Sequence, residues 1–408
     1  MIPWLASRIG LVFLWVAYGC YAARLMPVTA APPSFSPTSQ PAWGRISGGT
    51  NAAGQIFLEM LSLPADGKLP LPTPFPNITA AHLLTGKEGE PLPWVFNSDA
   101  TQLYIELPAR SRLNVPAMIL LETAEGTTQF ADGRIVFSAL DAKMQGQRAK
   151  LESHPGNHRI GFWVDPSDSV SWEYKPTRWG RYDAELTFSA DGGEGTELKF
   201  DFGGQTFSVR RPSTGSWYRY HTMPIGRLYL PKSEPFTVRA SGQALKGTAV
   251  MNLKAITLRP APEGQPITQE ASGAIVLQAR DAVTHSVMMR YEPQTNKNCL
   301  GYWVNPSDWA EWQFDVTQPG TFEIEVWQGC GNGQGGSDVA VEIAGDKFTF
   351  VVEETGHFQT FVPRKIGRVR LSAPGSYSLA VKPLRKKAGA VMDIREVRLL
   401  PTRQLREQ

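Results

Sequence analysis

The sequence predicts an all-β protein, with a small N-terminal β-sandwich followed by two tandem jelly-roll β-sandwiches. Composition is the first reason, because the 408 residues include 38 Gly and 32 Pro, with 10% aromatic side chains, as expected for many short strands and turns. The second is the frequent alternation of apolar and polar residues over short stretches. The third is that one segment of domain length occurs twice.

The repeated segment is clearest at Leu300–Val316, LGYWVNPSDWAEWQFDV, which matches Ile160–Pro176, IGFWVDPSDSVSWEYKP. The match extends to both sides, pairing Gly133–Ala142 with Gly273–Ala282 and Ala249–Leu253 with Ala390–Ile394. Its period is too long for a solenoid repeat of about 20–50 residues. We therefore expect two whole domains, copy 1 over residues 132–260 and copy 2 over residues 272–402.

The strands of copy 2 can be placed from their periodicity. Residues 312–316 and 322–326 carry apolar side chains at every second position, and Gln318–Gly320 lies between them as a turn. This pattern predicts an antiparallel hairpin with one face toward the core. Trp303 and Trp312, with Trp172 in copy 1, fall on the apolar phase and are expected to be buried.

The N-terminal region divides into three parts. Arg8, the apolar run Ile9–Ala17 and the small residues after it are typical of a secretory signal peptide, assigned to residues 1–23. We expect a secreted, periplasmic or cell-surface protein with no stable membrane span after signal removal; an uncleaved anchor is the alternative. Residues 24–54, rich in Pro, Ser and Thr, predict a linker. Residues 55–124 predict the small β-sandwich.

Charge and short motifs exclude several classes of function. A formal charge of +3 is small for this length and indicates no nucleic-acid partner. Neither a Gly-x-Ser-x-Gly elbow nor a His-Glu-x-x-His motif is present. No catalytic residue and no cofactor are therefore assigned.

Two cysteines remain after removal of the signal, Cys299 and Cys330. An exported chain with two cysteines favours a disulfide. The aligned positions of copy 1 are Arg159 and Ala190, so both cysteines are absent there together. These observations predict a Cys299–Cys330 bond, and two unrelated buried thiols are the alternative.

The hairpin motif Tyr302–Phe314 resembles the core signature of the family 6 and family 35 carbohydrate-binding modules. A further resemblance is to the non-catalytic β domains at the C-terminal end of bacterial alpha-L-fucosidases, carried by Leu63–Leu71, by the same hairpin motif and by Glu354–Pro363. Together these stretches cover most of the chain after the linker. The resemblance implies a sugar-binding protein built from β-sandwich modules.

Two departures from these families matter. Fucosidases place a catalytic barrel of about 250 residues ahead of these domains, and here only the signal and the linker precede the first β unit. The related modules often hold calcium through acidic residues of the first strand, where this chain has Gln278 and Arg280 in copy 2, and Ser138 and Leu140 in copy 1. Calcium prefers carboxylate oxygens, so no metal is expected at that site.

Candidate sugar-binding residues follow from the resemblance. A flat aromatic ring stacks on the apolar face of a pyranose, and polar groups beside it hold the hydroxyls. The stacking position is Tyr302 in copy 2 and Phe162 in copy 1. Trp309 lies in the adjacent turn, where copy 1 has Ser169, so copy 2 is expected to be the better-equipped site. The polar position near the closing strand, and the loop opposite, add the candidates Asp393, Asn252, His357 and Trp217.

Each candidate could instead be a packing residue. Asp168 and Asp308, in the Pro-Ser-Asp turns, could bind a hydroxyl but are expected to cap their own turns through backbone N–H groups.

The leading functional hypothesis is a secreted, non-catalytic carbohydrate-binding protein that docks on a polysaccharide or glycan, with a fucosylated one as a candidate. Two weak sites on one chain would gain avidity. A separately encoded glycoside hydrolase is a candidate partner. One alternative is a relative of alpha-L-fucosidase, a glycoside hydrolase without its own barrel. Another is a structural surface protein whose modules serve only protein contacts.

Overall fold

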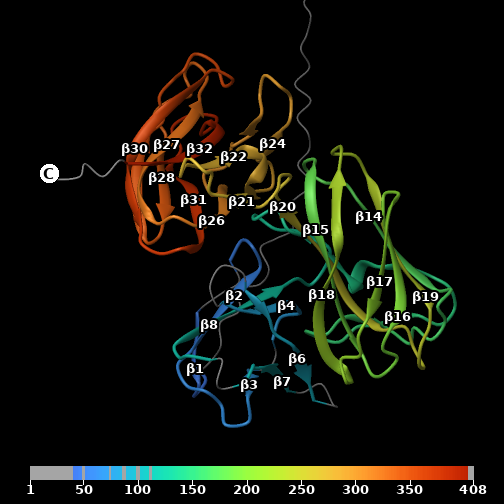
Figure 1. Ribbon diagram of the computed structural model, residues 1–408. Coiled ribbons are helices and arrows are strands. Elements are labelled where there is room, and N and C mark those ends of the chain that lie inside the picture. The colour runs from blue at the N-terminus through green and yellow to red at the C-terminus, as the bar shows by residue number, and fades with distance from the viewer. Residues whose placement is uncertain are drawn as a thin grey trace, which may run out of the picture.

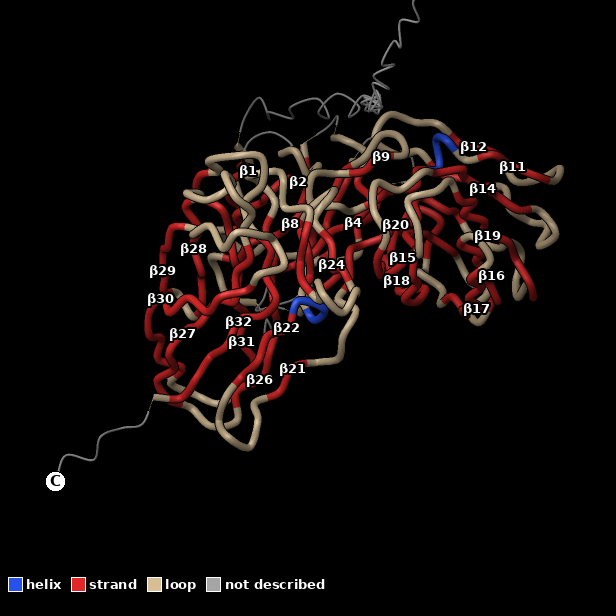
Figure 2. The backbone as a smooth tube through the Cα atoms, turned by 90° about the horizontal axis from the view of Figure 1, so that it is seen from above, coloured by secondary structure: helices blue, strands red, loops and turns tan. Residues whose placement is uncertain are grey.

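A computed structural model describes residues 40–47, 51–72, 75–84, 89–97, 102–109 and 113–402. The predicted signal peptide lies outside these residues. The prediction of an all-β fold is confirmed, because antiparallel sheets account for the regular structure (Figures 1 and 2). The helices of the described part are two three-residue 3₁₀ turns, η2 (Ala139–Asp141) and η3 (Ala279–Asp281). A helix long and apolar enough to cross a membrane does not occur in this part of the chain.

The N-terminal body is a small sandwich of two sheets. One sheet has the order β1-β2-β8-β4-β5 and the other contains β6, β7 and β3. The strands are β1 (Gly44–Ser47), β2 (Gln55–Met60), β3 (Lys68–Leu71), β4 (Ile78–Leu83), β5 (Glu90–Pro91), β6 (Trp94–Phe96), β7 (Leu103–Glu106) and β8 (Ala117–Thr123). Their inward-facing apolar side chains form one core cluster.

Strand β1 lies within residues 24–54, where composition predicted a linker, so that prediction is wrong for this stretch. The strand pairs with β2 through Gly44↔Met60. Trp43 and Ile46 are buried, and the Trp43 indole donates to the Pro70 carbonyl at 2.9 Å. These two apolar side chains anchor an edge strand in a polar stretch, because burying apolar surface lowers the free energy of the folded state.

Copy 1 is a sandwich of two antiparallel sheets. Its strands are β9 (Thr128–Gln129), β10 (Ile135–Ser138), β11 (Lys143–Gln145), β12 (Lys150–Glu152), β13 (Arg159–Gly161), β14 (Ser169–Tyr174), β15 (Gly180–Ala190), β16 (Thr196–Phe202), β17 (Gln205–Arg211), β18 (Ser216–Leu230), β19 (Phe236–Ala244) and β20 (Asn252–Ala261). The order is β12-β13-β20-β15-β18 in one sheet and β11-β14-β19-β16-β17 in the other.

Copy 2 repeats this architecture. Its strands are β21 (Ile267–Thr268), β22 (Ile275–Gln278), β23 (Val283–His285), β24 (Arg290–Glu292), β25 (Cys299–Gly301), β26 (Trp309–Val316), β27 (Gly320–Gly329), β28 (Asp338–Ile343), β29 (Asp346–Val351), β30 (Phe361–Leu371), β31 (Gly375–Arg385) and β32 (Asp393–Pro401). The sheet orders are β24-β25-β32-β27-β30 and β21-β26-β31-β28-β29. The predicted hairpin of residues 312–316 and 322–326 is therefore wrong, because β26 and β27 lie in different sheets, where β26 pairs with β31 and β27 with β30.

The two copies agree in detail as well as in strand order. In each copy a core tryptophan donates its indole N–H to a strand near the start of the module. Trp172 on β14 donates to the Ser138 carbonyl of β10 at 2.8 Å, and Trp312 on β26 donates to the Gln278 carbonyl of β22 at 2.7 Å. Trp172, Trp303 and Trp312 are all buried, as their apolar phase predicted. Duplicate sequence motifs therefore occupy duplicate positions.

The N-terminal sandwich and copy 2 each pack against copy 1 (Figure 1). Strand β6 pairs with β18 through Tyr220↔Trp94, so one sheet continues from the N-terminal sandwich into copy 1. A buried carboxylate, Glu122, lies across the same boundary, 2.6 Å from Arg134 and 2.6 Å from Arg259. Burial opposes its ionisation, but the two guanidinium groups outweigh that effect and lower the pKa of Glu122 below its ordinary value.

Candidate functional site

Each copy displays one aromatic ring at the same corner of its sandwich. Phe162 follows β13 and is 62% exposed, and Tyr302 follows β25 and is 43% exposed. Both adopt a left-handed backbone, with φ of +53° and +60°. This conformation costs a residue with a side chain on the order of 1 kcal/mol or more, and such strain concentrates at functional sites.

A tight turn produces this display. The amide of Val164 donates to the Phe162 carbonyl at 2.9 Å, and Val304 donates to Tyr302 at 3.0 Å. The tryptophan at the centre of each turn points into the core, while the residues on either side point out. Each copy thus presents an exposed pair of one aromatic ring and one valine, Phe162 with Val164 and Tyr302 with Val304.

The glycine before each aromatic ring is required by the packing. A Cβ at Gly161 would lie 2.0 Å from the Glu152 carboxylate, and one at Gly301 would lie 2.3 Å from that of Glu292. Real contacts are essentially never this short. The Gly-Phe and Gly-Tyr steps therefore allow a carboxylate to pack against the backbone immediately before the exposed ring.

A cation lies beside each ring. Lys150 Nζ is 5.9 Å from the Phe162 centroid, and the Arg290 guanidinium carbon is 3.4 Å from the Tyr302 centroid. Lys150 and Arg290 hold equivalent positions, since they pair with Gly161 and Gly301 respectively. Arg290 also contacts the ring of Trp179, at 3.8 Å, which comes from copy 1. Copy 1 therefore covers part of the space around the Tyr302 ring, whereas the Phe162 ring is more exposed to solvent.

Trp309 is half-buried at the start of β26. Its ring stacks on the His285 imidazole, with centroids 3.6 Å apart and planes at 4°. Lys382 Nζ lies 4.8 Å from the same ring. The indole is thus held by its own module, and it retains only part of its surface for a ligand.

In copy 1 the structure brings two of the candidates together. Asn252 is 7% exposed, and its amide donates to the Trp217 carbonyl at 3.0 Å. Trp217 itself packs against the core of copy 1. This pair ties β20 to β18, and its polar atoms face inward.

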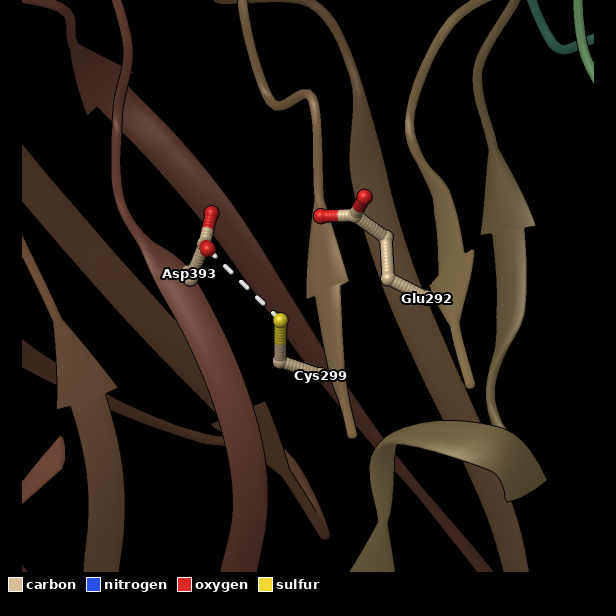
Figure 3. A group of neighbouring side chains, drawn as sticks. All are labelled: Glu292, Cys299 and Asp393. Atoms are coloured by element: carbon tan, nitrogen blue, oxygen red, sulfur yellow. Dashed lines mark hydrogen bonds between the residues drawn. The ribbon is translucent and has the colours of Figure 1, made fainter. Parts of the chain in front are cut away.

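In copy 2 the equivalent position, Asp393, is also buried, with 6% exposure. The thiol of Cys299 donates to its carboxylate at 3.5 Å (Figure 3). The side chain of Gln359 contributes to lowering the pKa of the same carboxyl group, against the larger effect of burial, and the backbone amide of Gln359 donates to His357 Nδ1 at 3.2 Å. His357 is exposed, so it lies on the surface loop and not beside the buried carboxylate.

The predicted disulfide is wrong. Cys299 and Cys330 are both free and buried, which is the alternative that the sequence left open. Cys299 lies on β25 and Cys330 follows β27, while β32 runs between these two strands. Strands two places apart lie about 9.6 Å from each other, beyond the Cα separation of about 7 Å that a disulfide can span.

Glu292, Cys299 and Asp393 form a cluster of potential metal ligands (Figure 3). One ligand atom of each lies within 4.8 Å of the others, and all three residues are buried. Burial, with the nearby Asp393 and Glu292 charges, raises the pKa of the Cys299 thiol. Burial and the Glu292 charge raise the pKa of Asp393 to about 7. Protonated forms are therefore favoured, and a metal ion would have to displace these protons.

Copy 1 fills the same positions differently. Arg159 replaces the cysteine and binds the Glu152 carboxylate through two bonds of 2.9 Å. Asn252 replaces the aspartate. Copy 2 therefore holds two carboxyl groups where copy 1 holds a neutral ion pair, and Lys297 approaches Glu292 from the side at 2.7 Å.

The two turn aspartates do not cap their own turns, contrary to expectation. The Asp168 carboxylate accepts from backbone amides of another loop, those of Gln147, Arg148 and Ala149. Asp308 accepts from the Ser286 hydroxyl at 2.6 Å. Asp165 and Asn305 cap the turns instead. The aspartates are buried and link distant segments, because three-dimensional packing brings those segments against the turn.

Sequence reasoning missed the cations and Trp179. The signal was present in the repeat, because a basic residue stands two positions before Glu152 and before Glu292 in both copies. Trp179 belongs to the turn Arg178–Arg181, where copy 2 has Gln318–Thr321. A difference between copies at a turn indicates a contact that only one copy makes.

Comparisons with known proteins give limited information. A family model described as a domain of unknown function, DUF5077, matches residues 289–403, which cover most of copy 2 and one residue beyond it. No curated protein matches.

Solved structures that match parts of the chain include a β-(1,4)-mannanase with a family 35 carbohydrate-binding module from Podospora anserina. It shows 16% identity and a TM-score of 0.27 over 33% of this chain and 29% of that chain. A family 35 module from Clostridium thermocellum shows 18% identity and a TM-score of 0.27, over 31% and 96%. The C-terminal family 6 module of a marine laminarinase from Zobellia galactanivorans shows 18% identity and a TM-score of 0.26. The match covers 31% of this chain and 98% of that chain.

These structures are carbohydrate-binding modules, or contain one, which agrees with one part of the sequence resemblance. At these identities and TM-scores they carry no functional argument. The link to fucosidases stays a prediction.

Proposed function

We propose that the protein binds carbohydrate without hydrolysing it, through the exposed aromatic rings of Phe162 and Tyr302. The observation that supports this is the repetition of one strained display in both copies: a left-handed aromatic residue, an exposed valine and a cation at the ring. The same backbone strain occurs in both copies, and strain of this kind is typical of residues whose position serves a function. An exposed flat ring with polar neighbours suits the apolar face of a sugar.

The two rings are not equivalent as binding sites. Phe162 is the more exposed, and among the described residues the cation at its ring, Lys150, comes from its own copy, whereas Trp179 of copy 1 contacts Tyr302 in addition to Arg290. The sequence favoured copy 2 because of Trp309, but that ring is already stacked on His285. We therefore assign the stronger sugar contact to Phe162.

The finer parts of this function rest on the sequence. A secreted or surface location follows from the predicted signal peptide, and a fucosylated glycan from the fucosidase resemblance. A separately encoded glycoside hydrolase as partner is part of the same proposal. Two modules on one chain would raise the avidity for a polysaccharide with repeated epitopes.

The test is binding of the whole chain to a panel of polysaccharides and fucosylated glycans, with the variants Phe162→Ala, Tyr302→Ala and the double variant. We expect each single change to weaken binding about tenfold, which is about 1.4 kcal/mol, with Phe162→Ala the more severe. The double variant should not bind. Leu384→Ala, at a 51% exposed position of copy 2, is the matched control. Unchanged affinity in the double variant would contradict the proposal.

A further inference from the structure

The two copies meet at a seam rich in arginine. The turn between β14 and β15 of copy 1 docks on copy 2, where the Arg178 guanidinium donates to the Thr284 hydroxyl at 2.7 Å and to the Met289 carbonyl at 2.6 Å. The Trp179 indole donates to the Tyr291 carbonyl at 3.3 Å. Side-chain hydrogen bonds from copy 1 to copy 2 therefore hold the seam together.

A small cavity lies inside this seam. Four arginines contribute to its wall, Arg178, Arg181, Arg280 and Arg290, and Glu263 is the single acidic residue there. Its volume of about 10 Å³ is room for the centre of one particle of about the size of water. Cations thus outnumber anions around a space that holds one small occupant.

The arginines present unused hydrogen-bond donors. Among the described residues, the Nε–H groups of Arg178, Arg181 and Arg290 find no acceptor, although each is buried from solvent. Arg178 is 4% exposed and Arg290 is 5% exposed. A buried donor without an acceptor destabilises the fold, and a charged donor does so more strongly. Three residues that line one cavity each carry such a donor, which indicates that an acceptor belongs among them.

The nearby acidic groups do not supply this acceptor. Glu263 lines the cavity, yet none of the three Nε–H groups is bonded to it. Asp281 lies 3.7 Å from Arg280 Nε, which is not one of the three. Asp308 interacts with the charge of Arg178. Its Oδ2 accepts from Ser286, and its buried Oδ1 also lacks a partner, so neither oxygen is bonded to the Arg178 Nε–H group.

We propose that this cavity is a binding site for a monatomic anion of the size of chloride, which joins copy 1 to copy 2. The charge of the wall selects an anion, and the volume excludes phosphate, sulfate and sugar carboxylates. Copy 2 cannot form the same site from its own turn, because Gln318 and Thr321 stand where copy 1 has Arg178 and Arg181. The site is thus specific to the seam and separate from the sugar-binding proposal.

Crystallography with sodium bromide tests occupancy directly. Bromide is a close substitute for chloride and gives an anomalous signal. We expect a peak between Arg178 and Arg290 in crystals of the whole chain. A seam cavity with no anomalous peak, whether it holds a water molecule or nothing, would overturn the proposal.

Thermal unfolding tests the effect on stability. A ligand that binds only the folded state raises the midpoint in a saturable way. We expect chloride to raise it by about 3 °C more than gluconate at equal ionic strength. In Arg181→Gln the chloride and gluconate curves should coincide, because Arg181 provides charge to the cavity while the Arg178 bonds of the seam remain. Arg227→Gln removes an exposed arginine that pairs with Asp183 at 2.7 Å, and it should keep the chloride effect. Coincident curves in the wild type, or a full chloride effect in Arg181→Gln, would refute the assignment.

Discussion

The buried carboxyl group of Asp393 makes copy 2 sensitive to pH in a direction opposite to that of most carboxylates. Burial, followed by the charge of Glu292, raises its pKa to about 7 in the folded protein, against an ordinary value of 3.8. The folded state therefore binds the proton more tightly than the unfolded state between these two values. Stability is highest below about pH 4 for this group and is lost as the pH rises toward 7.

The substitution Asp393→Asn removes this titration. Copy 1 has Asn252 at the same position, so the fold accepts an amide there. A difference of about three pKa units corresponds to about 4 kcal/mol, which is an upper limit because the site can relax. We expect the variant to be more stable than the wild type at pH 8, by about 1–4 kcal/mol, and to differ little at pH 4.

Calorimetry of the whole chain at both pH values measures this effect. A gain of 1 kcal/mol raises the midpoint of a domain of this size by about 4 °C. Hydrogen exchange at the amides of β32 assigns the gain to copy 2. Asp346→Asn, at an exposed position on β29, is the control and should shift neither midpoint. An equal change at pH 4 and pH 8, or a loss of stability at pH 8, would refute the reasoning.

Two further predictions concern packing. Glu122→Gln leaves Arg134 and Arg259 without their buried carboxylate and should destabilise the protein by about 3–5 kcal/mol near neutral pH. Because the pKa of Glu122 is lowered on folding, its contribution is present above pH 4.5 and is lost in acid. Urea titrations should therefore show the variant and the wild type converging as the pH falls, and a constant difference would contradict this. Gly161→Ala brings a Cβ to 2.0 Å from the Glu152 carboxylate. It should lower the melting temperature and disturb Phe162, while the double variant with Glu152→Ala should recover part of the loss; no recovery would place the strain elsewhere.

Local sequence was sufficient for the fold class and for the duplication. Alternation with period two shows which face of a strand is buried, since successive side chains point to opposite faces. Trp312 and Trp172 were placed correctly in this way. The position of the exposed rings could also be predicted from the sequence, because Tyr302 and Phe162 stand at the same place in the repeated motif. The strand β1 was not, since its burial depends on distant partners such as the Pro70 carbonyl.

The tertiary structure alone decided which polar residues face one another. Cys299 and Cys330 looked like partners in the sequence, but β32 separates them, because strand order is set by packing of the whole sandwich and not by spacing along the chain. Asp393 and Asn252 look alike as polar candidates, yet each is buried beside a group that only the fold brings near. The anion cavity has the same origin. Arg178 and Arg290 lie far apart in the chain, and the docking of one copy on the other brings their charges together away from water.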